Sequence, residues 1–424
     1  MNRTVPILLV ALCMCVMPHQ SQAQLSAESR ARVIDSLAKA VSNIYPAADT
    51  GAMIAQQLRA RAAAGAYSGA SDPALFARLV TQDLQSTNHD THLVLDMAGG
   101  AQGGAAPPAG HGVEQVDRLE GNVGYLRMSH FLGGNDANVA VEHALRELER
   151  TDAIILDLRN SRGGSAALAN FLISHFAPAD TQHSLTVYDR VRNTSFERYT
   201  MPSVPGPRRP DVPLFVLVDD VTRSAAEDVP FVLQNMKRAT IVGSNTAGAG
   251  RNNTIVPVGE GFVASISFTR VMEPVTHREW ERTGITPNVR VHPDSALPVA
   301  HALALEAIAA RTADVARQRE LRLTAEVVRA ARQRSLGSRR HRDYIGTYEG
   351  GQYVTLDGDR LVYQSRVAQP RVELVSMPDG SFGAGSARYL FAGTGAHATL
   401  KIVTADGRST VYARTSASVP LRRM

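Results

Sequence analysis

Four short segments of the chain carry side chains that could act together in nucleophilic chemistry. They contain His92, the Gly163-Gly164 pair, Ser224 and Glu281. A serine hydroxyl can attack a carbonyl once a base removes its proton, and histidine suits that role because it titrates near neutral pH. A carboxylate can orient the imidazole ring, and paired backbone N–H groups can hold an oxyanion. The segments are residues 88–92, 157–164, 222–227 and 280–287.

Each of these groups also has an ordinary structural explanation. A serine where a strand gives way to a helix is commonly a helix N-cap, and a Gly-Gly pair after a strand is commonly a turn. His92 is one of 13 histidines, and a glutamate such as Glu281, beside a tryptophan, is normally exposed. No single residue is diagnostic, and only the combination indicates a reactive site.

The elements around these residues could bring them to one edge of a sheet. From residue 123 onward, apolar strands alternate with helical patterns, which is typical of a parallel α/β core. Ser224 and the Gly163-Gly164 pair each follow such a strand, and the carboxyl ends of parallel strands lie at the same edge. The predicted strands are 123–128, 153–158, 214–218 and 240–242, and the predicted helices are 136–150, one ending near 176, and 224–236.

Regions of different character flank this core. Residues 25–90 show three helical patterns, and the glycine-rich residues 97–112 indicate a flexible link or a hairpin tip. Three Asp-Gly turns between alternating runs near the C-terminus predict an antiparallel β domain. We therefore divide the chain into a leader (1–23), an N-terminal helical subdomain (24–96), an α/β catalytic core (97–310), a helical, arginine-rich linker (311–342) and a small C-terminal β domain (343–424).

The leader has the features of a secretory signal peptide. Arg3 precedes a short apolar stretch, and Ser21 and Ala23 are small residues spaced for cleavage before Gln24. The only two cysteines of the chain lie in this leader, without the small preceding residue of a lipoprotein signal. We expect a bacterial periplasmic or secreted protein with no stable membrane anchor after cleavage, no disulfide and no thiol nucleophile.

The amino-acid composition excludes several classes of protein. Hydrophobic residues make up 44% and charged residues 20% of the chain, which excludes a disordered tail protein and a membrane bundle. The net charge is +5, and the local arginine run at residues 332–342 has no interleaved aromatic residues. That run indicates a solvated linker, and we expect no nucleic-acid partner.

Taken together, the motifs resemble peptidase family S41, the group of tail-specific proteases and interphotoreceptor retinoid-binding protein-like proteins. The resemblance covers about residues 30–300 and includes a D-x-H sequence at 90–92, as in the retinoid-binding-protein-like branch. It implies a ClpP/crotonase-like α/β core, with Ser224 as nucleophile and an oxyanion hole from Ala225 N–H and a glycine of the Gly163-Gly164 pair. The other matching motifs are D-L-R-N-x-x-G-G at 157–164, S-A-A-E-D at 224–228, L-Q-N-M-x-R-A-T-I-V-G at 233–243 and W-E-x-x-G-I-x-P at 280–287.

The identity of the base follows partly from the scarcity of lysine. Processing peptidases of the family use a lysine after the serine, but the matching segment, residues 246–250, has none. Lys237 lies at the far end of the helix that Ser224 begins, and thirteen helical residues span about 20 Å. Lys39 and Lys401, the other two lysines, lie in the outlying regions. These positions argue against a Ser–Lys dyad.

The tricorn-like branch of the family uses histidine, glutamate and a second hydroxyl instead. The resemblance places His92 as the base, Glu281 as the group that orients it, and Thr91 as the second hydroxyl. Threonine stands where that branch has serine, which keeps the hydroxyl. About 30 residues separate His92 from the first core strand, too few for a PDZ-like module.

These observations predict a secreted serine hydrolase, most readily an S41-type peptidase acting on peptide or protein substrates. Two alternatives stay open: a non-catalytic carrier of lipid or retinoid-like ligands on the same scaffold, and an esterase for small acyl groups. No metal and no organic cofactor is implied. The sequence gives neither the oligomeric state nor the role of the C-terminal β domain.

Overall fold

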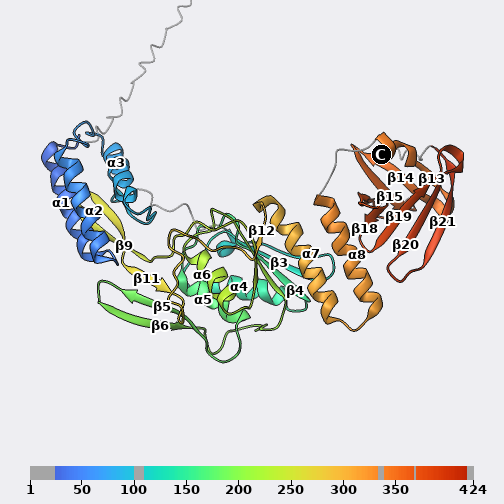
Figure 1. Ribbon diagram of the computed structural model, residues 1–424, viewed down its shortest axis with the longest axis horizontal. Helices are drawn as coiled ribbons and strands as arrows, with labels where there is room; N and C mark the ends of the chain where they lie inside the picture. The colour runs from blue at the N-terminus through green and yellow to red at the C-terminus, as the bar shows by residue number, and fades with distance from the viewer. Residues whose placement is uncertain (1–23, 100–108, 333–338, 367–368, 418–424) are drawn as a thin grey trace, which may run out of the picture.

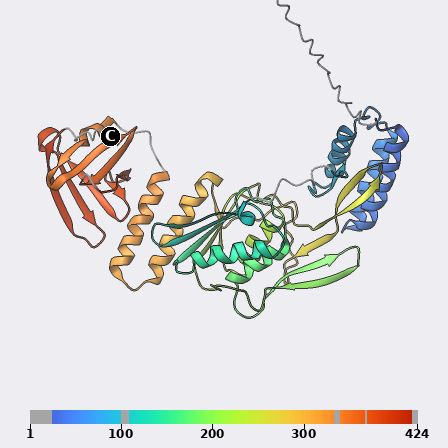
Figure 2. The ribbon, with the colours of Figure 1, turned by 180° about the vertical axis from the view of Figure 1, so that it is seen from behind.

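The structure, a computed structural model, describes residues 24–99, 109–332, 339–366 and 369–417 of the chain. The predicted leader lies outside the described residues, as do most of the glycine-rich segment and part of the arginine run. The N-terminal helices and the C-terminal β domain lie at opposite ends of a central α/β core (Figures 1 and 2). The mixed α/β architecture with these two flanking regions confirms the predicted fold class.

A six-stranded sheet with the order β12-β8-β7-β4-β3-β2 forms the centre of the core. Its strands are parallel except β2, which pairs antiparallel with β3 at one edge. The four strands predicted from the sequence correspond to β3, β4, β7 and β8. The strands are β2 (Val113–Leu119), β3 (Val123–Met128), β4 (Ala153–Asp157), β7 (Leu214–Val218), β8 (Thr240–Gly243) and β12 (Val289–Arg290).

Both faces of this sheet are covered by helices, which explains the uninterrupted apolar runs of its strands. Leu156 and Val216 pack under one layer of helices, whereas Ile155 and Leu217, on the opposite face, pack under the other. The first layer is α4 (Asn135–Glu147), α5 (Ala166–Phe176) and α6 (Ala225–Asn235), and the second is α7 (Pro293–Arg311) and α8 (Val315–Arg332). Helix α7 begins with a proline in its first turn, where proline's missing N–H costs no helical hydrogen bond.

Three helices and a small sheet form the N-terminal lobe. Ser26 and Asp72 cap the first and third helices by accepting backbone N–H bonds. The apolar faces of these helices pack on a sheet of order β1-β10-β9, whose strands β9 and β10 are drawn in yellow beside the blue helices in Figure 1. The elements are α1 (Ala27–Ile44), α2 (Ala48–Ala63), α3 (Pro73–Ser86), β1 (Val94–Met97), β9 (Asn253–Gly259) and β10 (Phe262–Ser267).

The hairpin β9–β10 therefore reaches from the core into the N-terminal lobe. Phe262, Ala264 and Ile266 are buried among the helices, although more than 150 residues separate them from that part of the sequence. The sequence analysis did not predict this hairpin. Its alternation of buried and exposed residues is a strand signal, but only the fold shows what it packs against.

A second hairpin projects from the core below the N-terminal lobe in Figure 1. It is formed by β5 (His183–Asp189) and β6 (Thr194–Tyr199), and β11 (Thr269–Met272) pairs antiparallel with β5. Most of β6 is exposed, and Arg198 is its one side chain that turns partly inward.

The C-terminal region is a nine-stranded antiparallel sheet of order β16-β15-β14-β13-β21-β20-β19-β18-β17. The three Asp-Gly pairs lie between β14 and β15, β17 and β18, and β20 and β21, as expected of hairpin turns. Helix α8 packs on α7 and also against β17 and β18, so it joins the core to this domain. The strands are β13 (Gly346–Tyr348), β14 (Gln352–Asp357), β15 (Arg360–Ser365), β16 (Val372–Glu373), β17 (Val375–Ser376), β18 (Phe382–Ala384), β19 (Ala387–Ala392), β20 (Thr399–Thr404) and β21 (Ser409–Ser416).

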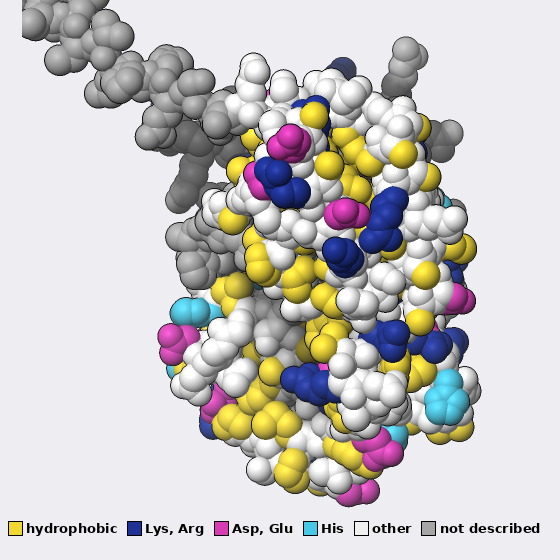
Figure 3. Space-filling model, turned by 90° about the vertical axis from the view of Figure 1, so that its left-hand side faces the viewer, with side chains coloured by type: hydrophobic (Ala, Val, Ile, Leu, Met, Phe, Trp, Pro, Cys, Tyr) yellow, Lys and Arg dark blue, Asp and Glu magenta, His cyan; other side chains and the backbone are white. Residues whose placement is uncertain are grey.

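Among the described helices, none combines the length and the apolarity that crossing a bilayer requires. Figure 3 shows the face formed by the N-terminal lobe, where arginine and lysine side chains are interspersed with acidic ones.

Candidate active site

Ser224 lies where β7 has ended and α6 begins. Its backbone has φ 55° and ψ −129°, a conformation that residues other than glycine rarely adopt. A sharp, strained strand-to-helix turn of this kind projects a nucleophilic serine in other hydrolases. Strain at a serine in this position is a reason to suspect function, because an ordinary N-cap does not require it.

The carboxylate of Glu227 holds this turn in place. Glu227 is fully buried, and it accepts a hydrogen bond of 2.9 Å from the backbone N–H of Ser224. Burial raises the pKa of Glu227, and its hydrogen bonds oppose that rise. The same carboxylate binds the loop after β8, accepting from the Thr246 hydroxyl at 2.5 Å and from the N–H groups of Gly248 and Ala249 at 2.8 Å each.

The Gly163-Gly164 turn packs directly against Ser224. A Cβ atom on Gly163 would lie 2.8 Å from Ser224 Cβ and 2.9 Å from the Ala225 nitrogen, so only glycine fits. Gly164 has φ 135°, and a Cβ there would lie 2.1 Å from the Phe131 carbonyl oxygen. Ala225 is the first residue of α6, so its N–H has no helical acceptor. The structure thus brings Gly163, Ser224 and Ala225 together.

His92 comes from the N-terminal lobe, in the turn between α3 and β1. Its Nδ1 lies 3.5 Å from Oδ1 of Asp90, and its backbone N–H donates to the same oxygen at 2.9 Å. The His92 side chain is 10% exposed and that of Asp90 is fully buried. At 3.5 Å the Nδ1 contact is an ion-pair contact outside hydrogen-bond geometry, and Nδ1 has no hydrogen-bond partner among the residues that the structure describes.

Asp90 lies at the centre of a buried polar cluster. Its Oδ2 accepts from the Tyr45 hydroxyl at 3.0 Å and lies 3.2 Å from Arg251 Nη1, which also contacts Tyr45. Burial alone would raise the pKa of Asp90, but His92, Ser267 and Arg251 outweigh it and hold that pKa below its ordinary value. Asp90 is therefore the carboxylate placed beside the imidazole of His92.

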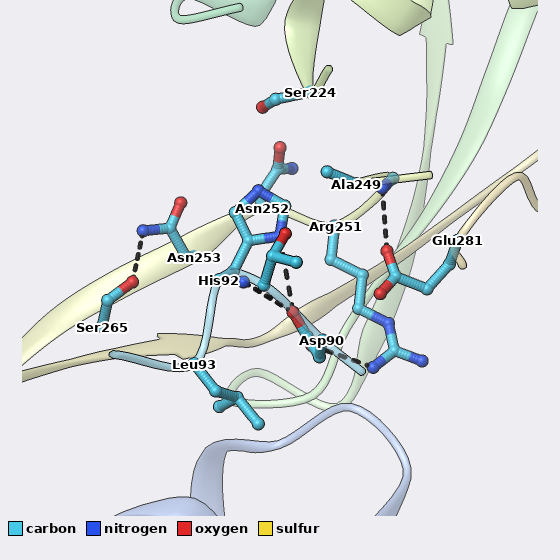
Figure 4. Close-up of polar contacts among 12 residues, drawn as sticks. Asp90, His92, Leu93, Ser224, Ala249, Arg251, Asn252, Asn253, Ser265 and Glu281 are labelled. Atoms are coloured by element: carbon cyan, nitrogen blue, oxygen red, sulfur yellow. Dashed lines mark hydrogen bonds and ion pairs between the residues drawn. The ribbon is translucent and has the colours of Figure 1, made fainter. Parts of the chain in front are cut away.

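Glu281 lies on the other side of Arg251 (Figure 4). It accepts a 2.8 Å hydrogen bond from Gly250 N–H and is 8% exposed. Burial and the nearby charge of Asp90 raise the pKa of Glu281 to about 7. Among the described residues, no hydrogen bond joins Glu281 to His92, although the two interact electrostatically. Glu281 therefore belongs to the same charge cluster without contacting the ring as a hydrogen-bond acceptor.

Thr91 is exposed at the surface of the same turn. Its hydroxyl accepts a hydrogen bond of 2.6 Å from Nη2 of Arg223. Within the described part of the chain, no hydrogen bond connects Thr91 to Glu281. The structure places Thr91 next to the residue that precedes Ser224 and does not place it between Glu281 and the ring.

Ser224 and His92 approach one region from two parts of the molecule (Figure 4). In the described residues, no hydrogen bond joins the serine hydroxyl to the imidazole. In the view of Figure 4, the amide of Asn252 lies in the space between them. Catalytic hydrogen bonds are often long before substrate binds, so this geometry is compatible with a serine–histidine pair.

The sequence analysis assigned no role to Asp90, Glu227 or Arg251. A signal was present for two of them, since Asp90 is part of the D-x-H motif and Glu227 follows the serine by three residues. For Arg251 there was none, because its role depends on Asp90, 161 positions away. In the described part of the chain, no group of three His, Cys, Asp or Glu side chains could hold a metal ion.

Comparisons with known proteins indicate the family of this chain. The model of peptidase family S41 matches residues 122–291, and the model of the N-terminal domain of Peptidase_S41 in eukaryotic IRBP matches residues 23–116. The carboxyl-terminal-processing protease of Synechocystis sp. is 33% identical over 169 residues, which are 39% of this chain and 37% of the relative. The carboxyl-terminal-processing protease of Picosynechococcus sp. is 29% identical over 178 residues, 41% of each chain. The chain thus matches well under half the length of these relatives.

Among solved structures, the photosystem II D1 C-terminal processing protease is 14% identical, with a TM-score of 0.43. That alignment covers 63% of this chain and 94% of the other.

Proposed function

This chain belongs to peptidase family S41, and we propose that it is a serine peptidase that cleaves peptide or protein substrates through Ser224. The observation that carries the proposal is the strained turn at the head of α6, with the backbone of Gly163 packed against Ser224 and Ala225 N–H. A carbonyl carbon next to Ser224 would have its oxygen within reach of that N–H, as an oxyanion hole requires.

In the proposed reaction, His92 removes the proton from the Ser224 hydroxyl as the oxygen attacks the carbonyl. The protonated ring then donates that proton to the leaving amine, and a water molecule repeats the cycle to release the acyl group. Asp90, 3.5 Å from Nδ1, stabilises the positive ring. Glu281 adds a second carboxylate to the cluster, and Arg251 between the two carboxylates limits their repulsion.

Labelling with a fluorophosphonate tests this proposal without knowledge of the substrate. We expect the mature protein to be labelled, Ser224→Ala to be unlabelled, and His92→Ala to be labelled far more slowly. His89→Asn is a matched control, because His89 is exposed on the same turn and asparagine tolerates its positive φ. Absence of labelling in folded protein would reject the serine hydrolase and favour a ligand-binding protein on this scaffold.

A peptidase and a small-acyl esterase share this machinery, so labelling does not separate them. Incubation with a peptide mixture and with short-chain acyl esters does. Turnover of peptides at rates that Ser224→Ala abolishes supports the peptidase, and turnover of esters alone would reject it.

We also propose that the protein acts in the bacterial periplasm or outside the cell. The support is the leader predicted over residues 1–23, with small residues before Gln24. The mature protein recovered from a periplasmic or culture fraction is expected to begin at Gln24. Recovery of the full-length chain from the cytoplasm would contradict this location.

A further inference from the structure

A small cavity adjoins the candidate nucleophile. Its volume is about 340 Å³, part of it open to solvent, and Ser224, Ala225 and Gly164 form one side. Val187 on β5 and Val271 on β11 form part of the remainder. The centre of a water-sized sphere can occupy only about 20 Å³ of this space, which is room for about one ordered water or the tip of a short polar side chain. A cavity beside a nucleophile is where the side chain preceding the scissile bond would lie.

Several buried polar atoms in the lining of this cavity are hydrogen-bond donors without an acceptor in the described structure. Among the described residues that line it, every buried side-chain polar atom without a hydrogen-bond partner is a donor. These atoms are Nε and Nη2 of Arg198, Nε of Arg251 and Nε1 of Trp280. Buried donors without acceptors are costly, at about 1–3 kcal/mol each. The lining therefore needs an acceptor that the protein does not provide.

Arg198 is the group best placed to receive such an acceptor. It lies on β6, and within the described part of the chain only its Nη1 is paired, donating to Oδ2 of Asp228 at 2.8 Å. Asp228 lies one turn into α6 from Ser224, so the ion pair is close to the reacting centre. The unpaired Nε and Nη2 form one edge of the guanidinium, and two parallel N–H groups on one edge match the two oxygens of a carboxylate.

From these unmatched donors, we propose that the cavity binds a carboxylate of the substrate, supplied by an acidic side chain on the acyl side of the scissile bond. The inference rests on the proposed peptidase function and adds a substrate class to it. Each of the two guanidinium groups that line the cavity already has one carboxylate partner, Asp228 for Arg198 and Asp90 for Arg251, but the Nε of both and the Nη2 of Arg198 remain without an acceptor in the described part of the chain. An apolar side chain would fill the space but leave the donors unmatched, and a lysine or arginine would meet like charge.

The test compares peptides that differ only in aspartate or asparagine before the scissile bond. A charge-assisted hydrogen bond contributes about 1.5–3 kcal/mol, so kcat/KM is expected to favour aspartate by about 10- to 150-fold. In Arg198→Gln this ratio falls to about one, and in Arg198→Lys it is intermediate because the charge remains but the paired donors do not. Arg192→Gln, on the exposed turn of the same hairpin, keeps the wild-type ratio.

Binding to the Ser224→Ala protein provides a readout that does not depend on turnover. Fluorescent peptides with amidated C-termini, carrying aspartate or asparagine, are compared by anisotropy with and without the Arg198→Gln change. Tighter binding of aspartate that Arg198→Gln abolishes supports the site. Asparagine peptides with a free C-terminal carboxylate test whether that carboxylate can bind instead of a side chain. If they bind more tightly than the amidated peptides and Arg198→Gln removes the difference, the site binds a terminal carboxylate.

Equal affinity for aspartate and asparagine, or a preference that survives Arg198→Gln in a folded variant, overturns the carboxylate site. That result is distinct from failure of the proposed function, in which no fluorophosphonate labels Ser224 and no peptide is cleaved. A further comparison uses peptides with alanine or valine immediately before the scissile bond. If these are cleaved faster than peptides with aspartate there, the peptidase function is supported and the carboxylate site is rejected.

Discussion

The α/β core and the N-terminal lobe hold their candidate catalytic residues by different means. In the core, backbone geometry places Ser224: a buried strand ends, a helix begins, and Glu227 binds backbone N–H groups of this turn and of the loop after β8. In the lobe, side-chain charges place His92 through Asp90, which Arg251 contacts from the core. Ser224 is therefore held by the backbone geometry of one turn, whereas His92 is held by a charge cluster that spans two regions.

The largest expected effect comes from removing the carboxylate of Glu227, which binds the serine turn. Glu227→Ala leaves the N–H groups of Ser224, Gly248 and Ala249 and the Thr246 hydroxyl without their acceptor. We expect the free energy of unfolding to fall by about 3–5 kcal/mol, since each buried unmatched donor costs about 1–3 kcal/mol and the loop relaxes in part. Urea unfolding measures the loss, and fluorophosphonate labelling should also disappear. Glu147→Ala, on an exposed position of α4, is the control.

A second change acts on the lobe. Asp90→Asn removes the carboxylate beside His92 Nδ1 and leaves Arg251 without its buried counter-charge. The labelling rate of Ser224 is expected to fall on the order of 10²-fold or more, because an orienting carboxylate contributes up to about 10⁴ in serine triads. A smaller loss than Glu281→Gln produces would show that Glu281, rather than Asp90, orients the ring.

A third prediction concerns the protonation of Glu281 and its effect on stability. The pKa of Glu281 is raised to about 7, so the folded state holds a proton that the unfolded state releases near its ordinary value. Stability therefore falls as pH rises from about 4.5 to about 7, by on the order of 3 kcal/mol for a shift of this size. Glu281→Gln should flatten the decrease in unfolding free energy between pH 5 and 8. Glu149→Gln, at an exposed position, should leave the decrease as it is in wild type.

The smallest effect is expected at Thr91. Its hydroxyl makes one exposed hydrogen bond, to Arg223, so Thr91→Val should change stability by less than about 0.5 kcal/mol. The labelling rate of Ser224 should change by less than about threefold, since an exposed hydrogen bond contributes little. A tenfold or greater loss would instead indicate that the hydroxyl relays between Glu281 and the ring when substrate is bound.

Much of the core could be predicted from the sequence. The strands around residues 123–128, 153–158 and 214–218 are continuous apolar runs because helices cover both of their faces. The hairpin β9–β10 could not be assigned to the N-terminal lobe, because periodicity indicates which face of a strand is buried but not the partner that buries it. Helix α8 is similar, since its pattern indicates a helix but not its contacts with both α7 and the β domain.

The side chains available for chemistry, and their local setting, follow from the sequence. It provides a serine at a strand–helix junction, a Gly-Gly turn on the neighbouring strand, a histidine in a D-x-H motif and no lysine in the segment where a dyad would need one. These features are local, and local spacing is preserved when the chain folds. The packing of the folded chain settles which carboxylate lies beside His92, that Glu227 also binds the loop after β8, and that Arg198 faces a cavity next to Ser224. Each of these contacts depends on burial and on how helices, loops and hairpins pack, which sequence spacing does not encode.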